Sequence, residues 1–306
     1  MSKIERIIMF EGGVETLDYF SRQMGQAFEA HGLLVFYFNL EDAASDVKKV
    51  KKFILSGKTA IVTFNFEGFE REEYIYDHVR GYIWQHFDIE IYNIAVDHPY
   101  FYDNRFEHLL EDDKILPGLI KKYHHLSIDR EHQKYMRTFY PQFDEAGFLP
   151  LAGTRLDGKS ADTVICDKIA KETKAKDKSR DIIFTGNYTD LAFFDQYIYG
   201  INDEYAQFYM GMIDDLIANP DKTVENVIIS HCNEEMGPQR LSDLRVPIHK
   251  TIFVDMFVRS YFRGKMIQTL ANAGFEIAVV GAGWETLPLK KPNRFTIIPQ
   301  TNSRNS

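Results

Sequence analysis

The first half of the chain alternates short apolar runs with longer segments in which apolar residues recur every three or four positions. The short runs predict strands, and the longer segments predict amphipathic helices. We expect strands at 6–10, 33–38, 59–66 and 89–96, and helices at 16–30, 44–55 and 73–86. Strands that alternate with helices are typical of right-handed crossover units, so the pattern predicts a parallel sheet covered by helices.

The pattern weakens after Pro99. It predicts a short strand at 121–127, a short helix at 132–139 and an edge strand at 148–152. Residues 168–180 are dense in Lys, Glu and Asp and hold almost no large apolar side chain, which is typical of a solvated helix or a linker. We therefore expect a first domain over 1–155 and a linker over 156–180.

A second alternating region covers 181–306. It predicts strands at 181–185, 275–280 and 294–298, with helical segments at 191–219, 224–231 and 254–273. A complete doubly wound domain has roughly five or more strands, and this region offers fewer. The sequence thus predicts an α/β fold with two Rossmann-like domains, the second incomplete and carrying a helical insertion.

Charge and cysteine content narrow the classes of partner. Asp and Glu total 45 against 36 for Lys and Arg, a net charge of -9, and such a field repels phosphate backbones and anionic lipid, so we expect no nucleic-acid partner. No apolar run approaches the length of a membrane span, and the run at 7–10 is too short for a secretory signal. Cys166 and Cys232 lack paired spacing, which predicts reduced thiols in a cytoplasmic protein rather than a zinc site or a disulfide framework.

Two glycine turns follow apolar runs in the second region. Gly281 and Gly283 come directly after the run at 275–280, and Gly186 follows the strand predicted at 181–185. Glycine lets the backbone turn tightly and approach a ligand, and amides at the start of a helix attract anions. Because ligands of open α/β sheets bind at the carboxyl ends of strands, the two turns predict a cleft lined by two strand ends.

Arg259 and Arg263 lie four residues apart on the helix predicted before the second glycine turn, so they share one face. Two guanidinium groups on one face could bind a phosphate, or they could pair with the acidic surface of the protein. The sequence leaves both interpretations open.

In the first domain, Gly12 and Gly13 follow the first strand where a nucleotide-binding turn would lie, but the G-x-G-x-x-G spacing is missing. We favour a plain tight turn, which as a functional element would shape the interdomain cleft. Asp97 and His98 close the fourth strand, where a carboxylate and an imidazole suit acid–base or hydroxyl-binding work. We favour this function over the alternative that Asp97 caps the next segment and His98 packs or faces water.

A cluster of histidines invites a metal interpretation. His124, His125, Asp129 and His132 lie close in sequence, but they lack the helical pair of ligands four residues apart and any Cys or Glu at a familiar offset. We therefore expect no metal site and assign these residues structural or surface roles. Asp129 precedes a helical run and is expected to cap it.

Three runs in this order and spacing resemble the spore-protein CgeB-like glycosyltransferases: IAVDHP, DIIFTGNYTD and VDMFVRSYFRGKMIQTLANAGFEIAVVGAGWE. The resemblance covers most of the chain from about residue 90 onward, and the last run is the most specific. The family is similar to GT-B glycosyltransferases, which have two facing Rossmann-like domains, the acceptor mainly on the first, the nucleotide-sugar donor mainly on the second, and no obligatory metal.

The resemblance implies roles for the candidate residues. Asp97 and His98 would face the acceptor, with one of them the base for the attacking hydroxyl. The residues on the donor side would be Gly186, Asn187, Tyr188, Arg259, Arg263, Gly281, Gly283 and Trp284. The family pattern continues past the glycine–tryptophan motif into a further half-domain that would complete the donor site, so the resemblance also implies a truncated second domain.

We therefore expect a cytoplasmic glycosyltransferase without cofactor, which moves a sugar from a nucleotide-diphosphate donor to a hydroxyl of a polysaccharide, protein or small molecule. Truncation would leave the chain inactive alone. The alternative is a noncatalytic α/β ligand-binding or assembly protein derived from such an enzyme. An NAD-dependent enzyme is disfavoured because the dinucleotide fingerprint is missing.

Overall fold

The computed structural model describes residues 3–143, 147–150 and 180–299. The chain divides into two compact units, and each is described by itself. Unit 1 comprises Met1–Ala152 with Leu241–His249, and unit 2 comprises Gly153–Arg240 with Lys250–Ser306. Among the described residues, no helix is long and apolar enough to cross a membrane.

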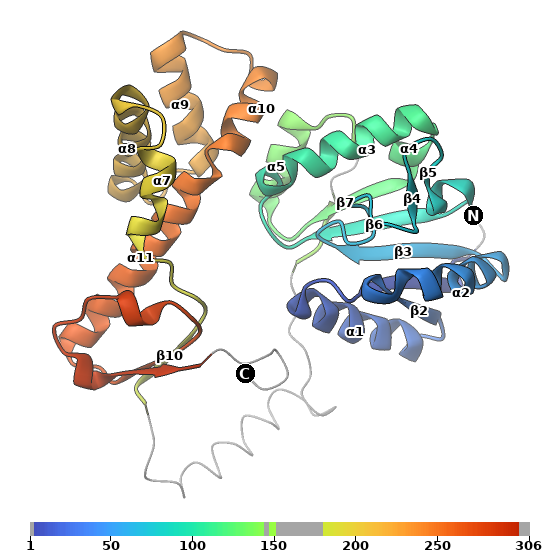
Figure 1. Cartoon of the computed structure of the whole chain (residues 1–306), viewed down its shortest axis with the longest axis horizontal. Coiled ribbons are helices and arrows are strands. Elements are labelled where there is room, and N and C mark those ends of the chain that lie inside the picture. Colours follow the sequence, from blue (N-terminus) through green and yellow to red (C-terminus); the bar gives the residue numbers. More distant parts are fainter. Residues whose placement is uncertain (1–2, 144–146, 151–179, 300–306) are drawn as a thin grey trace, which may run out of the picture. The chain divides into compact units, whose positions relative to one another are not determined.

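Unit 1 is built on a six-stranded sheet in which every pair of neighbouring strands is parallel (Figure 1). The strand order is β2-β1-β3-β6-β7-β8. The strands are β1 (Arg6–Glu11), β2 (Leu34–Asn39), β3 (Thr59–Phe64), β6 (Glu90–Ala95), β7 (Tyr123–Ser127) and β8 (Gly147–Phe148). The predicted parallel α/β architecture is confirmed for this unit, which is consistent with a Rossmann-like fold.

Helices cover both faces of this sheet. They are α1 (Glu15–Ala30), α2 (Ala43–Leu55), α3 (Asp103–Ile115), α4 (Leu119–Lys122) and α5 (Arg130–Phe139), with short 3₁₀ turns at Leu40–Asp42 and Pro99–Tyr102. Helix α1 packs on the face that carries Ile7 and Met9. Side chains alternate along a strand, so Phe36, which meets Phe53 of α2, lies on the opposite face from Val35, which packs with α1.

The prediction of a helix at 73–86 is wrong. The segment forms a small antiparallel pair, β4 (Tyr76–Asp77) and β5 (Gly81–Tyr82), followed by a 3₁₀ turn at Ile83–His86. The Asp77 carboxylate accepts hydrogen bonds from the amides of Val79 and Arg80, and Gly81 adopts φ 72. This turn chemistry overrides the helical spacing of the apolar residues. The pattern also missed α3, whose buried side chains include Asp103 and Asp112.

Unit 2 combines a helical part with a small parallel sheet. The sheet has the order β11-β10-β9, formed by β9 (Ile182–Thr185), β10 (Ile277–Val280) and β11 (Phe295–Ile298). The helices are α7 (Asp195–Ile198), α8 (Asp203–Ala218), α9 (Val224–Met236) and α11 (Ile252–Ala273), with 3₁₀ turns at Leu191–Phe194, Trp284–Thr286 and Pro292–Arg294. Helix α11 contacts α8, and its last turns pack Ile267 and Ala271 against the sheet residues Ile277 and Val279.

Helix α10 (Leu241–Lys250), which the sequence pattern did not predict, belongs to unit 1 over Leu241–His249, although these residues lie within the range expected for the second domain. Its anchor is Arg245, whose side chain is only 16% exposed. The Arg245 Nε lies 3.0 Å from Oδ1 of Asp103, the guanidinium also pairs with Glu107, and it lies over the ring of Tyr140. The Tyr140 hydroxyl donates to the same Asp103 carboxylate, so α10 closes a buried polar cluster of unit 1.

We predict that Arg245→Ala lowers the free energy of unfolding of unit 1 by about 3 kcal/mol, because Asp103 stays buried without its cation. The exposed pair Lys134–Glu131 provides the control, since Lys134→Ala should cost less than about 1 kcal/mol. The chain has two tryptophans, Trp84 and Trp284, one in each unit. Urea titration of 5-fluorotryptophan-labelled protein by ¹⁹F NMR therefore follows each unit separately, and equal effects of the two variants on the Trp84 signal would contradict the anchoring role.

Candidate functional site

From β1 the chain continues to β2 on one side of it in the sheet and then to β3 on the other side, so the order of strands switches at β1. The loops that follow the carboxyl ends of β1 and β3 lie at this switch point, which is where open α/β sheets bind ligands. The loop after β1 carries the Gly12-Gly13 turn, and the loop after β3 carries Asn65 and Glu67. Together with Asp97, which follows β6, these residues are called the switch-point site below.

The Gly12-Gly13 turn requires its glycines. Gly12 adopts φ 84, in the left-handed region, and its amide donates to Oδ1 of Asp18 on α1 at 3.0 Å. A side chain at Gly13 would overlap the Glu67 carboxylate. The turn therefore lies directly on Glu67, and its tight geometry depends on that close approach.

Glu67 is the buried polar side chain of the site, whereas Asn65 is partly exposed and Asp97 is exposed. Glu67 is 7% exposed, its Oε1 accepts the Val14 amide at 3.1 Å, and its Oε2 is buried without a hydrogen-bond donor among the described residues. Burial raises the pKa of Glu67 to about 7; the Val14 hydrogen bond opposes this shift and the charge of Asp18 adds to it. Glu67 was not among the predicted site residues, although Glu67-Gly68 directly after a predicted strand repeats the Glu11-Gly12 pattern that follows the first strand.

The loop that carries Glu67 has a strained backbone. Asn65 (φ 47) and Phe66 (φ 68) adopt left-handed conformations that non-glycine residues avoid. The Phe66 amide donates to the Asn93 side chain at 2.9 Å, and the Thr63 hydroxyl donates to the Glu67 carbonyl at 2.7 Å. Strain of this kind persists where surrounding contacts enforce it and concentrates at functional sites.

Asp97 and His98 are adjacent in sequence but occupy different surroundings. Asp97 is exposed, and its Oδ2 accepts hydrogen bonds from Asn65 Nδ2 at 3.1 Å and from the Tyr102 hydroxyl at 2.9 Å. Burial and the neighbouring Asp97 carboxylate raise the pKa of Tyr102, which keeps this hydroxyl a donor. His98 is buried, its Nδ1 accepts the Tyr100 amide at 3.3 Å, and its ring stacks on Tyr100.

The switch-point site is therefore acidic and rich in hydrogen-bonding groups. Glu67 and Asp97 supply carboxylates, Asn65 supplies an amide, and Asp18 lies at the start of α1. The nearby Arg22 is engaged by Glu11. Carboxylates and amides suit the hydroxyl groups of a neutral or cationic ligand and oppose a phosphate.

In unit 2 the two glycine turns hold each other. The Gly186–Tyr188 and Gly281–Trp284 segments are called the paired turns below. The Ala282 amide donates to the Asn187 side chain at 2.9 Å, the Tyr188 amide donates to the Ala282 carbonyl at 3.0 Å, and the Trp284 indole donates to the Gly186 carbonyl at 2.7 Å. A side chain at Gly281 would overlap the Gly186 carbonyl, and one at Gly283 would overlap the Tyr188 carbonyl.

The aromatic residues of the paired turns belong to the core. Trp284 is 1% exposed and stacks on Tyr188 with ring centroids 5.3 Å apart. Both rings pack with Ile277 and Val279. Their faces are used inside the unit, so Trp284 and Tyr188 stabilise the turns rather than offering a stacking surface.

The two arginines of α11 have different partners. Arg263 donates through a terminal nitrogen to the Asn187 carbonyl at 2.7 Å, which places its guanidinium at the paired turns. Arg259, one helical turn earlier, makes a bidentate pair with the buried Asp255 at 2.9 and 2.8 Å. Of the two interpretations left open by their spacing, Arg259 shows the ion pair, whereas Arg263 is positioned beside the candidate anion site.

The histidines of β7 and α5 make protein contacts. His124 bonds Glu90 at 2.8 Å, and burial together with the neighbouring His132 lowers the pKa of His125 to about 3. In the described ranges, no three His, Cys, Asp or Glu side chains gather into a group that could hold a metal ion. The prediction that Asp129 caps the following helix is confirmed, since its side chain accepts the Glu131 amide at 2.7 Å.

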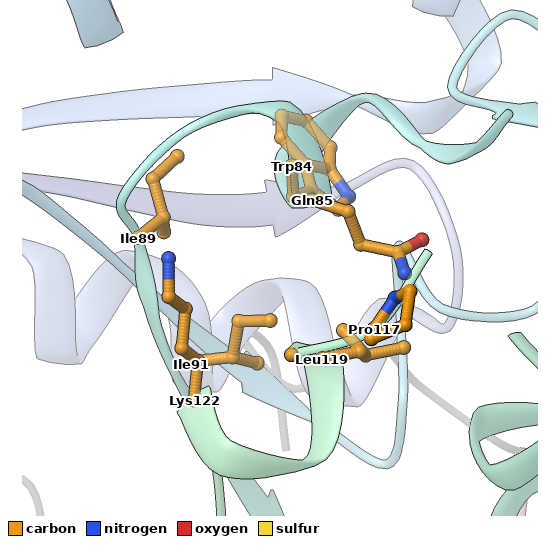
Figure 2. A pocket seen from close by; sticks show the side chains of 8 residues that line it. Trp84, Gln85, Ile89, Ile91, Pro117, Leu119 and Lys122 are labelled. Carbon is orange, nitrogen blue, oxygen red and sulfur yellow. The ribbon is translucent and has the colours of Figure 1, made fainter. Parts of the chain in front are cut away.

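A cavity of about 60 Å³ lies elsewhere in unit 1. Its lining includes Ile89 just before β6, Ile91 in β6, and Leu119 and Lys122 on α4 (Figure 2). Ligand pockets are typically about 300–1,000 Å³, so this cavity is too small for a sugar nucleotide. We treat it as a packing defect.

Comparison of the chain with protein-family models, with curated proteins and with solved structures found no match. The structure itself defines the class: an α/β protein whose unit 1 is a six-stranded parallel sheet flanked by helices.

We predict that Gly283→Ala destabilises unit 2 more than Gly274→Ala, because both glycines adopt positive φ but only Gly283 faces a backbone oxygen. The strained φ alone should cost about 1 kcal/mol at Gly274, and the overlap should add at least about 2 kcal/mol at Gly283. The ¹⁹F signal of Trp284 in a urea titration measures both. Equal losses would contradict the packing explanation for Gly283.

We predict that Glu67 makes unit 1 less stable as pH rises. A folded pKa of about 7 against an ordinary 4.5 means that the unfolded chain ionises first, so stability is fully present below pH 4.5 and is lost as pH rises to 7. The loss amounts to about 3 kcal/mol. In Glu67→Gln, stability relative to the wild type should therefore increase by about this amount between pH 4.5 and 8.

The ¹⁹F signal of Trp84 in urea titrations at both pH values measures this difference. The titration of His125 affects both proteins equally and cancels. A difference that does not change with pH would contradict a raised pKa at Glu67.

Proposed function

We propose that the chain is a glycosyltransferase of the two-domain GT-B type, which moves a sugar from a nucleotide-diphosphate donor to a hydroxyl acceptor. The acceptor would bind mainly to unit 1 at the switch-point site, and the donor mainly to unit 2 at the paired turns. The ordered motifs that resemble CgeB-like glycosyltransferases support the same reaction class.

One observation carries the proposal: the carboxyl edges of the two parallel sheets differ in chemical character. The edge of unit 1 presents Asp97 and Asn65, which suit hydroxyl groups. The edge of unit 2 presents two glycine turns with Arg263 beside them, which suits a diphosphate. A transferase that joins a hydroxyl to a sugar and releases a nucleoside diphosphate needs both kinds of site.

In the proposed step, Asp97 takes the proton of the acceptor hydroxyl, because it is the exposed carboxylate of the switch-point site and is held in place by Asn65 and Tyr102. The hydroxyl oxygen forms a bond to the anomeric carbon, and the bond from that carbon to the diphosphate breaks. The electron pair leaves with the nucleoside diphosphate, whose growing charge Arg263 stabilises. His98 would support this site from its buried position rather than act as the base.

A specific observation favours a second candidate, a noncatalytic ligand-binding or assembly protein. Gly281, Gly283 and Trp284 are each used in contacts between the paired turns, so packing alone accounts for them. Under this alternative the same edges would bind a ligand without turnover.

We predict that the full chain binds UDP- or GDP-sugars and that Arg263→Ala weakens this binding at least about tenfold, because a charge-assisted hydrogen bond to phosphate is lost. Isothermal titration calorimetry measures both proteins. Lys265→Ala removes an exposed cation from the same helix and should stay within about twofold of the wild type.

Absence of binding by the wild-type chain would contradict the donor site. Binding that Arg263→Ala leaves unchanged would place the diphosphate away from the paired turns. Binding without sugar transfer to any hydroxyl acceptor would favour the noncatalytic alternative.

A further inference from the structure

The Glu67 side chain joins two loops of the switch-point site. Its Oε1 accepts the amide of Val14, the residue that precedes α1, and no side chain of that segment caps the helix. The Val14 carbonyl in turn accepts the amides of Leu17 and Asp18 in the first turn of the helix. Glu67 thus ties the glycine turn and the start of α1 to the loop after β3.

The same carboxyl group is poorly suited to carry a charge where it lies. Its Oε2 is buried without a donor, and among the described residues Glu67 forms no ion pair. The charged groups that act on it are Asp18 from α1, and Glu70 and Glu72 from its own loop. All three are carboxylates, so they oppose ionisation, and only the Val14 amide favours it.

Ionisation of Glu67 is therefore unfavourable in its buried position, and the neighbouring turn can move to expose the carboxylate. The group above it is the backbone of Gly13, which has no side chain to keep the turn in place. Gly12 and Gly13 give the turn more conformational freedom than any other pair of residues would. A small movement of the turn would expose the Glu67 carboxylate to water and break its hydrogen bond with the Val14 amide.

We propose that Glu67 is a proton-controlled latch on the Gly12–Val14 turn, closed when its carboxyl group is neutral and released when the group ionises. Release changes the shape of the switch-point site, so it regulates acceptor binding there, and this consequence rests on the proposed function. Because burial raises the pKa of Glu67 to about 7, the latch operates close to neutral pH. An ordinary glutamate, with a pKa near 4.5, would be released at every physiological pH.

The test uses the full chain, deuterated and labelled with ¹⁵N-valine, without any nucleotide sugar. The Val14 amide signal is assigned by its loss in Val14→Ile and is followed from about pH 5.5 to 8.5. We expect its chemical shift to pass through one inflection near pH 7. Its protection from hydrogen exchange, corrected for the intrinsic rate at each pH, should fall about tenfold per pH unit as the pH rises toward that inflection and be almost lost above it.

Two variants make the result specific. Glu67→Gln keeps the acceptor for Val14 but cannot ionise, so the inflection should vanish and protection should persist to high pH. Glu70→Gln removes one of the opposing charges from an exposed residue, so it should keep the inflection and move it to slightly lower pH.

Three results would overturn the latch: a flat wild-type titration, an inflection that persists in Glu67→Gln, or an inflection without loss of protection, which would mean that the group ionises in place. Since the samples contain no nucleotide sugar, these outcomes are independent of nucleotide-sugar binding. The latch and the proposed glycosyl transfer can therefore fail separately.

Discussion

Parallel pairing of β1, β3 and β6 brings the ends of three strands to one edge of the sheet, and the chemistry of unit 1 depends on this constraint. The loop after each strand must turn away at the same edge, so Gly13, Glu67 and Asp97 come together although they are distant in sequence. The hydrogen bond from the Val14 amide to Glu67 then joins the loops after β1 and β3 at the switch point. The acid-rich character of the switch-point site follows from which residues happen to end each strand.

Both units have glycine turns at the carboxyl ends of parallel strands, but the turns pack on different groups. In unit 2, glycine allows one turn to pack on the other, and the contact is backbone against backbone, with Asn187 and the Trp284 indole completing the hydrogen bonds. In unit 1, glycine allows the turn to pack on a carboxyl group, which is a titratable partner. The contacts of the first arrangement involve no titratable group, whereas those of the second include the Glu67 carboxyl group.

Sequence patterns predicted the strands of unit 1 because each is a short apolar run with a sharp polar boundary. They failed at 73–86, where the carboxylate of Asp77 and the backbone of Gly81 decide the conformation. They placed Arg259 and Arg263 on one face, but which of them pairs with an acid depends on Asp255 and on a carbonyl of a distant turn. The Glu-Gly pattern after the third strand marks the position of Glu67, but its burial and its contact with Gly13 arise from the tertiary structure and are not visible in the sequence.

The assignment of Leu241–His249 to unit 1 has a consequence for how the protein is made. Domains generally fold as units while the chain is still being synthesised. Asp103 and Tyr140 are translated long before Arg245, so the nascent first unit holds a carboxylate in its interior that has not yet met its counter-ion. Its packing is completed only after residue 249 has left the ribosome, when residues 153–240 of unit 2 have already been made.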